Sequence, residues 1–239
     1  MIDVHCHILP ALDDGARDLE DSVAMAVQAV EDGIEVVCAT PHIRPDHLVR
    51  IAELPARVAA VQAELTRREV DLRVACGGEI AEKVAAGLSD AELYDLSLDG
   101  GGWVLIEPTP GPLGADLLSL VDGLLGRGTR VVVAHPERHA SVGFEDRLRR
   151  LTERGALLQW TAAFFAGAAV GDLVLEYASA GLVHLLGSDA HSSRAGRPAR
   201  LAAGLARLGE VCSPEQVEWI ARDAPRAVLA GAGSLTPPW

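Results

Sequence analysis

Cysteine is scarce in this sequence. The 239 residues include only four, Cys6, Cys38, Cys76 and Cys212, and no two of them form a Cys-x-x-Cys pair. This spacing excludes a disulfide scaffold and a cysteine-rich zinc knot. The N-terminus also lacks the basic and apolar regions of a signal peptide, so we expect a cytoplasmic protein.

Long apolar runs and an excess of basic charge are absent as well. No apolar stretch approaches the roughly 20 residues that a membrane-spanning helix needs, so we expect no membrane insertion. The 21 Lys and Arg residues are outnumbered by 34 Asp and Glu residues, which gives a formal net charge of −13. An acidic surface repels nucleic acid and anionic lipid, so neither is an expected partner.

The sequence instead alternates between two kinds of segment. Short β-branched runs, typical of buried parallel strands, occupy residues 2–4, 35–39, 73–76, 103–106, 130–134, 157–160 and 183–186. Helical patterns occupy residues 20–32, 54–68, 114–126, 144–153 and 170–180, and residues 198–229 also have a helical composition. Seven β/α units predict a single α/β barrel domain over residues 1–230, followed by an irregular tail at residues 231–239.

Side chains that bind metals follow almost every predicted strand. In β/α barrels the C-terminal strand ends and the loops after them build the active site, so these side chains are expected to converge on one face. They are His5, His7, His42, Glu79, Glu107, His135, Asp189 and His191.

The spacing of these residues favours chelation. His5 and His7 lie two residues apart on a strand, so both imidazoles point to one side and Cys6 points to the other. Asp189 and His191 repeat this spacing. A lone His-x-His fits two core or surface histidines equally well, but chance is a poor explanation for the whole set. Imidazole with carboxylate suits zinc, iron or manganese, and the lack of a thiolate favours an open catalytic cluster.

Six short motifs contain these residues and occur in order along the chain. They are Met1-Ile2-Asp3-Val4-His5-Cys6-His7-Ile8-Leu9-Pro10 with Asp13-Asp14-Gly15, then Ala39-Thr40-Pro41-His42, Gly78-Glu79-Ile80, Leu105-Ile106-Glu107, Ala134-His135-Pro136-Glu137-Arg138 and Gly187-Ser188-Asp189-Ala190-His191. Together they resemble the polymerase-and-histidinol-phosphatase (PHP) superfamily. Within it they are similar to the bacterial PHP-type protein-tyrosine phosphatases linked to capsule and exopolysaccharide synthesis.

The resemblance implies a distorted (β/α)7 barrel with a trinuclear metal site. It assigns the first ion to His5, His7, Glu79 and Asp189, the second to Glu79, Glu107 and His135, and the third to Asp14, His42 and His191. Manganese is the first candidate, with iron or zinc as alternatives. The four carboxylates carry −4 and three divalent ions would carry +6, so the pocket would be cationic and would suit a phosphate dianion.

The implied activity is hydrolysis of protein phosphotyrosine by a metal-bridging hydroxide, without a phosphoenzyme. Arg138 and Arg197 are expected to bind phosphate oxygens. Arg194 competes with Arg197 for this role, because the segment after His191 is one residue longer than is usual in the family. The resemblance also implies a bacterial tyrosine kinase as the phosphoprotein partner.

Three other functions compete with this interpretation. A small-molecule phosphatase, with histidinol phosphate as the obvious substrate, would use the same metal site. A degenerate barrel could serve as a non-catalytic metal-binding or kinase-interaction module, although every ligand position is occupied. A polymerase-associated nuclease is disfavoured, because no polymerase region accompanies the barrel and the net charge opposes DNA.

Several residues depart from the family pattern or match no ligand position. Ile43 stands where the family often has a second histidine. Asp13 is expected to be a loop or cap residue, and Glu137 either supports a ligand histidine or pairs with an arginine. Three histidines remain unassigned, of which the last lies in an apolar strand and is expected to be a core residue: His47, His139 and His184.

Overall fold

The computed structural model describes the backbone of residues 1–239 and the side chains of all of them except residues 168–170 and residue 173. Nine strands run through it: β1 (Ile2–Cys6), β2 (Val36–Ala39), β3 (His42–Ile43), β4 (Arg73–Cys76), β5 (Glu79–Ala81), β6 (Trp103–Glu107), β7 (Arg130–Ala134), β8 (Leu157–Thr161) and β9 (Leu185–Gly187). All seven predicted strands are found, each within two residues at either end.

The helices surround these strands. They are α1 (Leu19–Glu31), α2 (Leu54–Arg67), α3 (Glu82–Ala85), α4 (Asp90–Asp95), α5 (Ala115–Gly126), α6 (Phe144–Thr152), α7 (Ala162–Ala166), α8 (Ala168–Ser179), α9 (Ala202–Leu208), α10 (Pro214–Glu218) and α11 (Ala224–Leu229). Short 3-10 turns occupy Ile51–Glu53, Leu98–Gly100 and Pro136–His139, and a π-helical turn occupies Trp219–Asp223. The five predicted helices are confirmed, whereas α3, α4 and α7 had no counterpart in the prediction.

Local sequence explains where the longer helices begin and end. The side chain of Asp18 accepts a hydrogen bond from the backbone of Asp21 and so caps the N-terminus of α1. Gly33 follows the same helix with a φ of +88°, a left-handed conformation that glycine adopts without steric cost.

All strand pairs are parallel, but they form two sheets rather than one closed barrel. One sheet has the order β1-β2-β4 and the other has the order β3-β5-β6-β7-β8-β9. Between β1 and the chain after β9, the backbones form an isolated bridge, Cys6 to Ala190, and a few hydrogen bonds rather than a paired strand. The expected distorted (β/α)7 barrel is therefore not confirmed, because the strand hydrogen bonds close no barrel.

Two breaks at matching positions split the sheet. Thr40-Pro41 separates β2 from β3, and Gly77-Gly78 separates β4 from β5. Proline has no N–H to donate to a strand neighbour. Gly78 has no room for a larger residue, because a Cβ there would lie 2.7 Å from Leu96 and 3.0 Å from Ile43. Each of the second and third predicted strands is therefore followed by a further short strand, β3 or β5, and only these short strands join the larger sheet.

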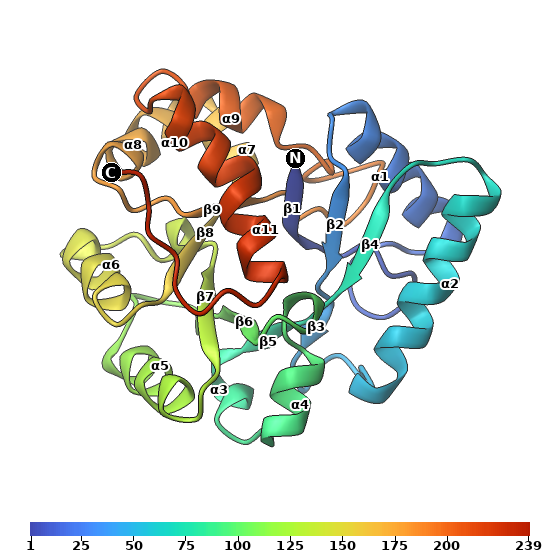
Figure 1. The fold of residues 1–239 in the computed structure, drawn as a ribbon, viewed down its shortest axis with the longest axis horizontal. Coiled ribbons are helices and arrows are strands. Elements are labelled where there is room, and N and C mark those ends of the chain that lie inside the picture. The colour runs from blue at the N-terminus through green and yellow to red at the C-terminus, as the bar shows by residue number, and fades with distance from the viewer.

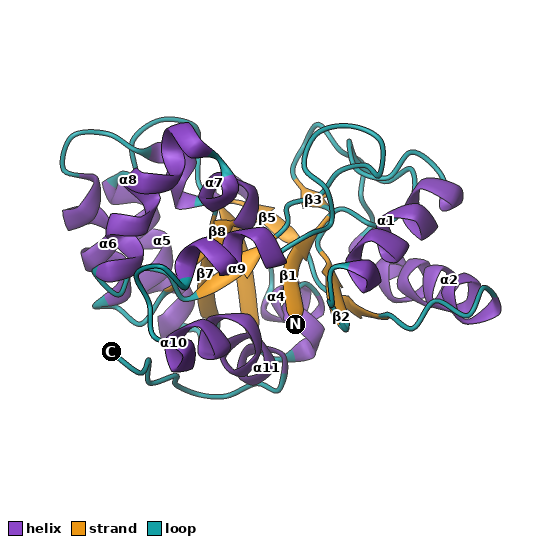
Figure 2. Ribbon diagram, turned by 90° about the horizontal axis from the view of Figure 1, so that it is seen from above, coloured by secondary structure: helices purple, strands orange, loops and turns teal.

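The strands lie between two groups of helices. Helices α1 and α2 lie beside β1, β2 and β4, whereas α5 and α6 lie beside β7 and β8 (Figures 1 and 2). The strands are buried apolar runs, as expected of parallel strands covered on both faces. None of the helices in the described part of the chain is long and apolar enough to cross a bilayer.

Candidate metal centre

The side chains of all nine predicted ligands come together at one end of the strands. Their donor atoms form four overlapping groups, and all the atoms of a group lie within 4.8 Å of one another. The groups are His5, His7 and Asp189; His5, Glu79 and His135; His42, Glu79 and Glu107; and His7, Asp14, His42 and His191.

His5 and His7 face one another at the centre of this cluster. The Nδ1 atom of His5 lies 2.8 Å from the Oε1 atom of Gln159, and the Nδ1 atom of His7 lies 2.8 Å from a carboxylate oxygen of Asp13. These oxygens only accept, so in the neutral form that binds a cation each ring would carry its proton on Nδ1. The two Nε2 atoms, 3.2 Å apart, then present lone pairs toward the same point, which is the arrangement that a shared cation satisfies.

Glu79 connects the groups. Its Oε1 atom lies 2.7 Å from the Nε2 atom of His135, and its Oε2 atom lies 2.8 Å from the Nδ1 atom of His42. Burial would raise the pKa of this carboxyl group, but the neighbouring imidazoles of His5 and His135 hold the pKa well below its usual value. Glu79 is therefore an ionised carboxylate that is only 1% exposed, and its position fits the bridging role implied by the family resemblance.

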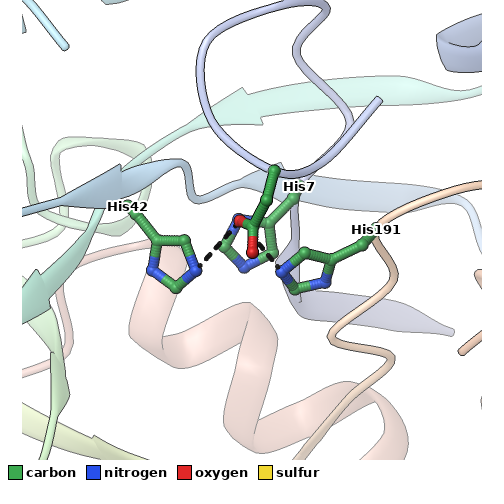
Figure 3. A group of neighbouring side chains, drawn as sticks. His7, His42 and His191 are labelled. Carbon is green, nitrogen blue, oxygen red and sulfur yellow. Dashed lines mark ion pairs between the residues drawn. The ribbon is translucent and has the colours of Figure 1, made fainter. Parts of the chain in front are cut away.

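Asp14 completes a second part of the cluster near the surface. Its Oδ1 atom lies 3.4 Å from the Nε2 atom of His42 and 3.5 Å from the Nε2 atom of His191. The ring of His7 stacks against His191 with centroids 3.9 Å apart. Figure 3 shows His42 and His191 pointing at a carboxylate between them, with His7 directly behind it.

Two of the predicted ligands lie on strained backbone. His135, directly after β7, has a φ of +31°, and Asp189, just after β9, has a φ of +50°. Left-handed conformations are costly for residues other than glycine and persist where the surrounding structure needs them, as at binding sites. Both strand-end turns therefore aim a side chain into the cluster.

The donor set fits divalent cations. It combines imidazoles with carboxylates and contains no thiolate, which suits manganese, iron or zinc. Burial lowers the pKa of His135 to about 4, and burial with the nearby His7 lowers that of His191 to about 3, so both rings are neutral as ligands require. The Oε2 atom of Glu79 and the Nδ1 atom of His42 lie 2.8 Å apart but form no hydrogen bond with each other or with any other described residue, as expected of two atoms oriented for a shared cation.

Two arginines lie beside the cluster. Arg138 and Arg197 both pair with the Oδ2 atom of Asp189, Arg197 through Nη2 at 3.0 Å. The Nε atom of Arg197 also donates to the carbonyl of Asp189 at 2.8 Å. Both line a cavity of about 400 Å³ together with the ligands Asp14 and His191, whereas Arg194 is exposed and does not line it. Of the two competing arginines, the structure places Arg197 at the site.

Two residues that orient the ligands were not assigned this role from the sequence. Asp13, expected to be a loop or cap residue, contacts the ring of His7 with its carboxylate. The same carboxylate accepts from the backbone N–H groups of Gly15 and His42, so it connects its own loop with His7 and with the start of β3. Gln159 was not singled out. Its position inside the apolar strand β8 was the available signal, because a buried polar side chain needs a partner.

The remaining polar residues have structural positions. Glu137 accepts from the backbone N–H of Thr161 at the end of β8, so neither of its two expected roles is observed. His184 is a buried core histidine, as predicted, and accepts from the backbone of Leu158. His139 lies 2.8 Å from the carbonyl of Gly111.

Cys6 lies between two predicted ligands but is directed away from them. It is fully buried and its Sγ atom lies 3.9 Å from the carbonyl of Ala190. Burial raises the pKa of this thiol well above its usual value. A protonated thiol with no access to the cavity is a poor nucleophile.

Comparison with known proteins identifies the family. The family model described as capsular polysaccharide synthesis, CpsB/CapC, matches residues 1–230. The chain belongs to the CpsB/CapC family. Its relatives include tyrosine-protein phosphatase YwqE of Bacillus subtilis, 36% identical over 80% of this chain and 78% of YwqE. The putative tyrosine-protein phosphatase CapC of Staphylococcus aureus is 27% identical over 80% of this chain and 77% of CapC.

A solved structure of the CpsB/CapC family has the same fold. It comes from work on YwqE of Bacillus subtilis and CpsB of Streptococcus pneumoniae, described there as unique metal-dependent tyrosine phosphatases. The TM-score is 0.87 with 29% identity, over 100% of this chain and 98% of that one. The predicted membership of a phosphatase family linked to capsule synthesis is thereby confirmed.

Proposed function

We propose that this protein is a metal-dependent phosphatase that hydrolyses phosphotyrosine in proteins. The observation that carries the proposal is the convergence of nine ligand side chains in a member of the CpsB/CapC family, four of which line one cavity together with Arg138 and Arg197. Small, strongly charged pockets of this kind suit a phosphoryl group. The full-length likeness to metal-dependent tyrosine phosphatases supports the choice of substrate.

The nine residues would hold three divalent ions, with manganese as the first candidate. His5, His7 and Asp189 would share one ion, and the grouping of Glu79 with both His135 and Glu107 fits a bridging carboxylate. Asp14, His42 and His191 would hold the third. Bound divalent ions would lower the pKa of a water molecule and neutralise charge on the phosphoryl oxygens.

The chain's own side chains would orient the phosphoryl group. Arg138 and Arg197 are each about a third exposed at the cavity, and each offers the planar fork of donors that matches phosphate oxygens. A tyrosyl phenolate, the conjugate base of a group with a pKa near 10, leaves without a strong general acid. Buried Cys6 takes no part in this proposal.

Replacing Arg138 is expected to weaken transition-state binding. Arg138→Ala should lower kcat/KM by about 10²-fold, equivalent to about 2.7 kcal/mol, because a charged pair of hydrogen bonds to phosphate is lost. Arg138→Lys should recover only part of this loss. Steady-state kinetics and metal analysis would check both variants, and the manganese content should be unchanged.

The same assay compares the two competing arginines. Arg197→Ala is expected to lower kcat/KM, and Arg194→Ala to leave it near the wild-type value, because only Arg197 lines the cavity. Kinetics of Arg138→Ala or Arg197→Ala close to those of the wild type would remove that residue from the phosphate site.

Substrate preference tests the proposed function. Manganese-loaded protein should hydrolyse a phosphotyrosyl peptide with a kcat/KM at least about 10-fold above those for histidinol phosphate and a phosphoseryl peptide. A preference for histidinol phosphate would instead favour the small-molecule phosphatase. Inactivity toward all of these and toward p-nitrophenyl phosphate would favour a non-catalytic module.

The family description supports a role in capsular polysaccharide synthesis. For the phosphoprotein substrate we propose a bacterial tyrosine kinase, because such a kinase carries phosphotyrosine after autophosphorylation. The four cysteines are all unpaired, which supports a reducing, cytoplasmic location. Mixing the protein with an autophosphorylated kinase and following loss of phosphotyrosine would test this partner.

A further inference from the structure

A third arginine borders the same cavity, and sequence motifs did not single it out. Arg44 lines the cavity of about 400 Å³ together with Arg138 and Arg197. The three arginines come from the loops that follow β3, β7 and β9. Arg44 is 29% exposed, and its Nη1 atom lies 3.5 Å from the Oε2 atom of Glu107. It therefore borders the part of the cluster formed by His42 and Glu107.

Local contacts orient the guanidinium of Arg44. Its Nε atom donates to Asp46 at 2.9 Å, and its Nη2 atom lies 3.3 Å from the Nε2 atom of His47. The ring of His47 in turn stacks on the ligand His42, with centroids 5.4 Å apart. Because Ile43 is buried between His42 and Arg44, the alternation along the chain directs both polar side chains to the cavity side.

All three arginines contact carboxylates of the predicted ligand set. Arg138 and Arg197 pair with Asp189, and Arg44 pairs with Glu107. A carboxylate that coordinates a cation attracts a guanidinium less strongly, because the cation neutralises part of its negative charge. The donors of the three arginines would then be available to an anion in the cavity that they line.

We propose that Arg44 is a third phosphate-binding residue, which contacts the phosphoryl group from the Glu107 side while Arg138 and Arg197 reach it from the Asp189 side. This inference rests on the proposed phosphatase function and extends it. Arg44 contacts the group that every phosphomonoester shares, so it contributes to binding of phosphate itself rather than to recognition of the leaving group.

Binding of inorganic phosphate to the manganese-loaded full chain tests this role. Arg44→Ala should weaken phosphate binding about 10-fold, both as a competitive inhibitor of p-nitrophenyl phosphate hydrolysis and in calorimetry. The KM for p-nitrophenyl phosphate and for a phosphotyrosyl peptide should rise by the same factor. Arg44→Lys should recover part of the affinity, because lysine keeps the charge but lacks the fork of donors.

Arg50→Ala is the matched control. Arg50 lies six residues further along and is 80% exposed, and among the described side chains it pairs only with nearby Glu53, so its removal should change neither phosphate affinity nor KM. Manganese content is measured for every variant. Loss of manganese with unchanged phosphate affinity in Arg44→Ala would overturn the inference, because Arg44 would then only position Glu107. A KM change confined to the peptide would also overturn it.

The two proposals can fail separately. If the wild-type protein hydrolyses no phosphomonoester, the proposed function is wrong, and calorimetry with inorganic phosphate still decides whether Arg44 binds the anion. If Arg44→Ala does not fold, as judged by circular dichroism, Arg44→Lys and Arg44→Gln provide the same comparison. Wild-type phosphate affinity in both of these variants would contradict the inference.

Discussion

Exhaustive removal of metal ions is expected to abolish the phosphatase activity of this protein, and added manganese is expected to restore it. Nine imidazole and carboxylate donors converge with facing lone pairs, and Glu79 lies buried at their centre. Divalent cations bound there would lower the pKa of a water molecule and so make it nucleophilic near neutral pH. Activity is measured on p-nitrophenyl phosphate after chelation and after graded addition of manganese.

Reloading with manganese should depend on pH. Burial would lower the pKa of His7, but its hydrogen bonds with Asp13 and Glu79 raise that pKa to about 9 in the metal-free chain. A cation must therefore displace a proton from His7 at neutral pH. The apparent affinity for manganese should fall as the pH is lowered from about 9, and titrations at several pH values measure this effect.

Circular dichroism of the chelated protein serves as a control for unfolding, because it shows whether the metal-free chain keeps its fold. A phosphatase that needs no metal, assayed in parallel, shows that the chelator itself does not inhibit the assay. Full activity in a sample shown by elemental analysis to lack metal would contradict the proposed chemistry.

The second large effect is expected for Glu79→Ala. This change removes the carboxylate that contacts both His135 and His42, so cations on both sides of it lose a shared ligand. We expect kcat to fall by about 10³-fold or more, with a loss of bound manganese. Turnover and metal content are measured on the same samples.

Cys6→Ser is the matched control for Glu79→Ala. Cys6 is also fully buried beside the ligands, but its thiol is directed toward the carbonyl of Ala190. Serine is close in size, so most of the activity and all of the manganese should remain. If Cys6→Ser were as inactive as Glu79→Ala, a thiolate nucleophile would replace the proposed mechanism.

Much of the fold could be predicted because its signals are local. Seven apolar β-branched runs and five helical patterns predicted elements that the structure contains, since strand and helix periodicities depend on neighbouring residues. The two breaks in the sheet were not predicted. Thr40-Pro41 and Gly77-Gly78 are visible in the sequence. Only the pairing of β2 with β4 and of β3 with β5 shows that the two breaks lie side by side on neighbouring strands.

Most of the ligand set was also accessible from sequence, because every ligand except Asp14 lies at or just after the end of a predicted strand. That position depends on local alternation, as for His5 and His7, and parallel strands bring their ends to one face. The family resemblance added Asp14 and the expected grouping of ligands. The structure then placed the donor atoms of all nine residues in four overlapping groups.

Only the tertiary structure decided which groups support these ligands. Gln159 contacts His5, which lies 154 positions away in the sequence. Asp13 contacts both His7 and the backbone of His42. Arg44, in the loop after β3, lies beside Glu107 at the end of β6. Strand periodicity predicts on which side of a strand a ligand lies. It does not predict which atoms come within the roughly 3–4 Å that hydrogen bonds and ion pairs require. Such distances depend on how separate segments pack, and no local pattern along the chain contains that information.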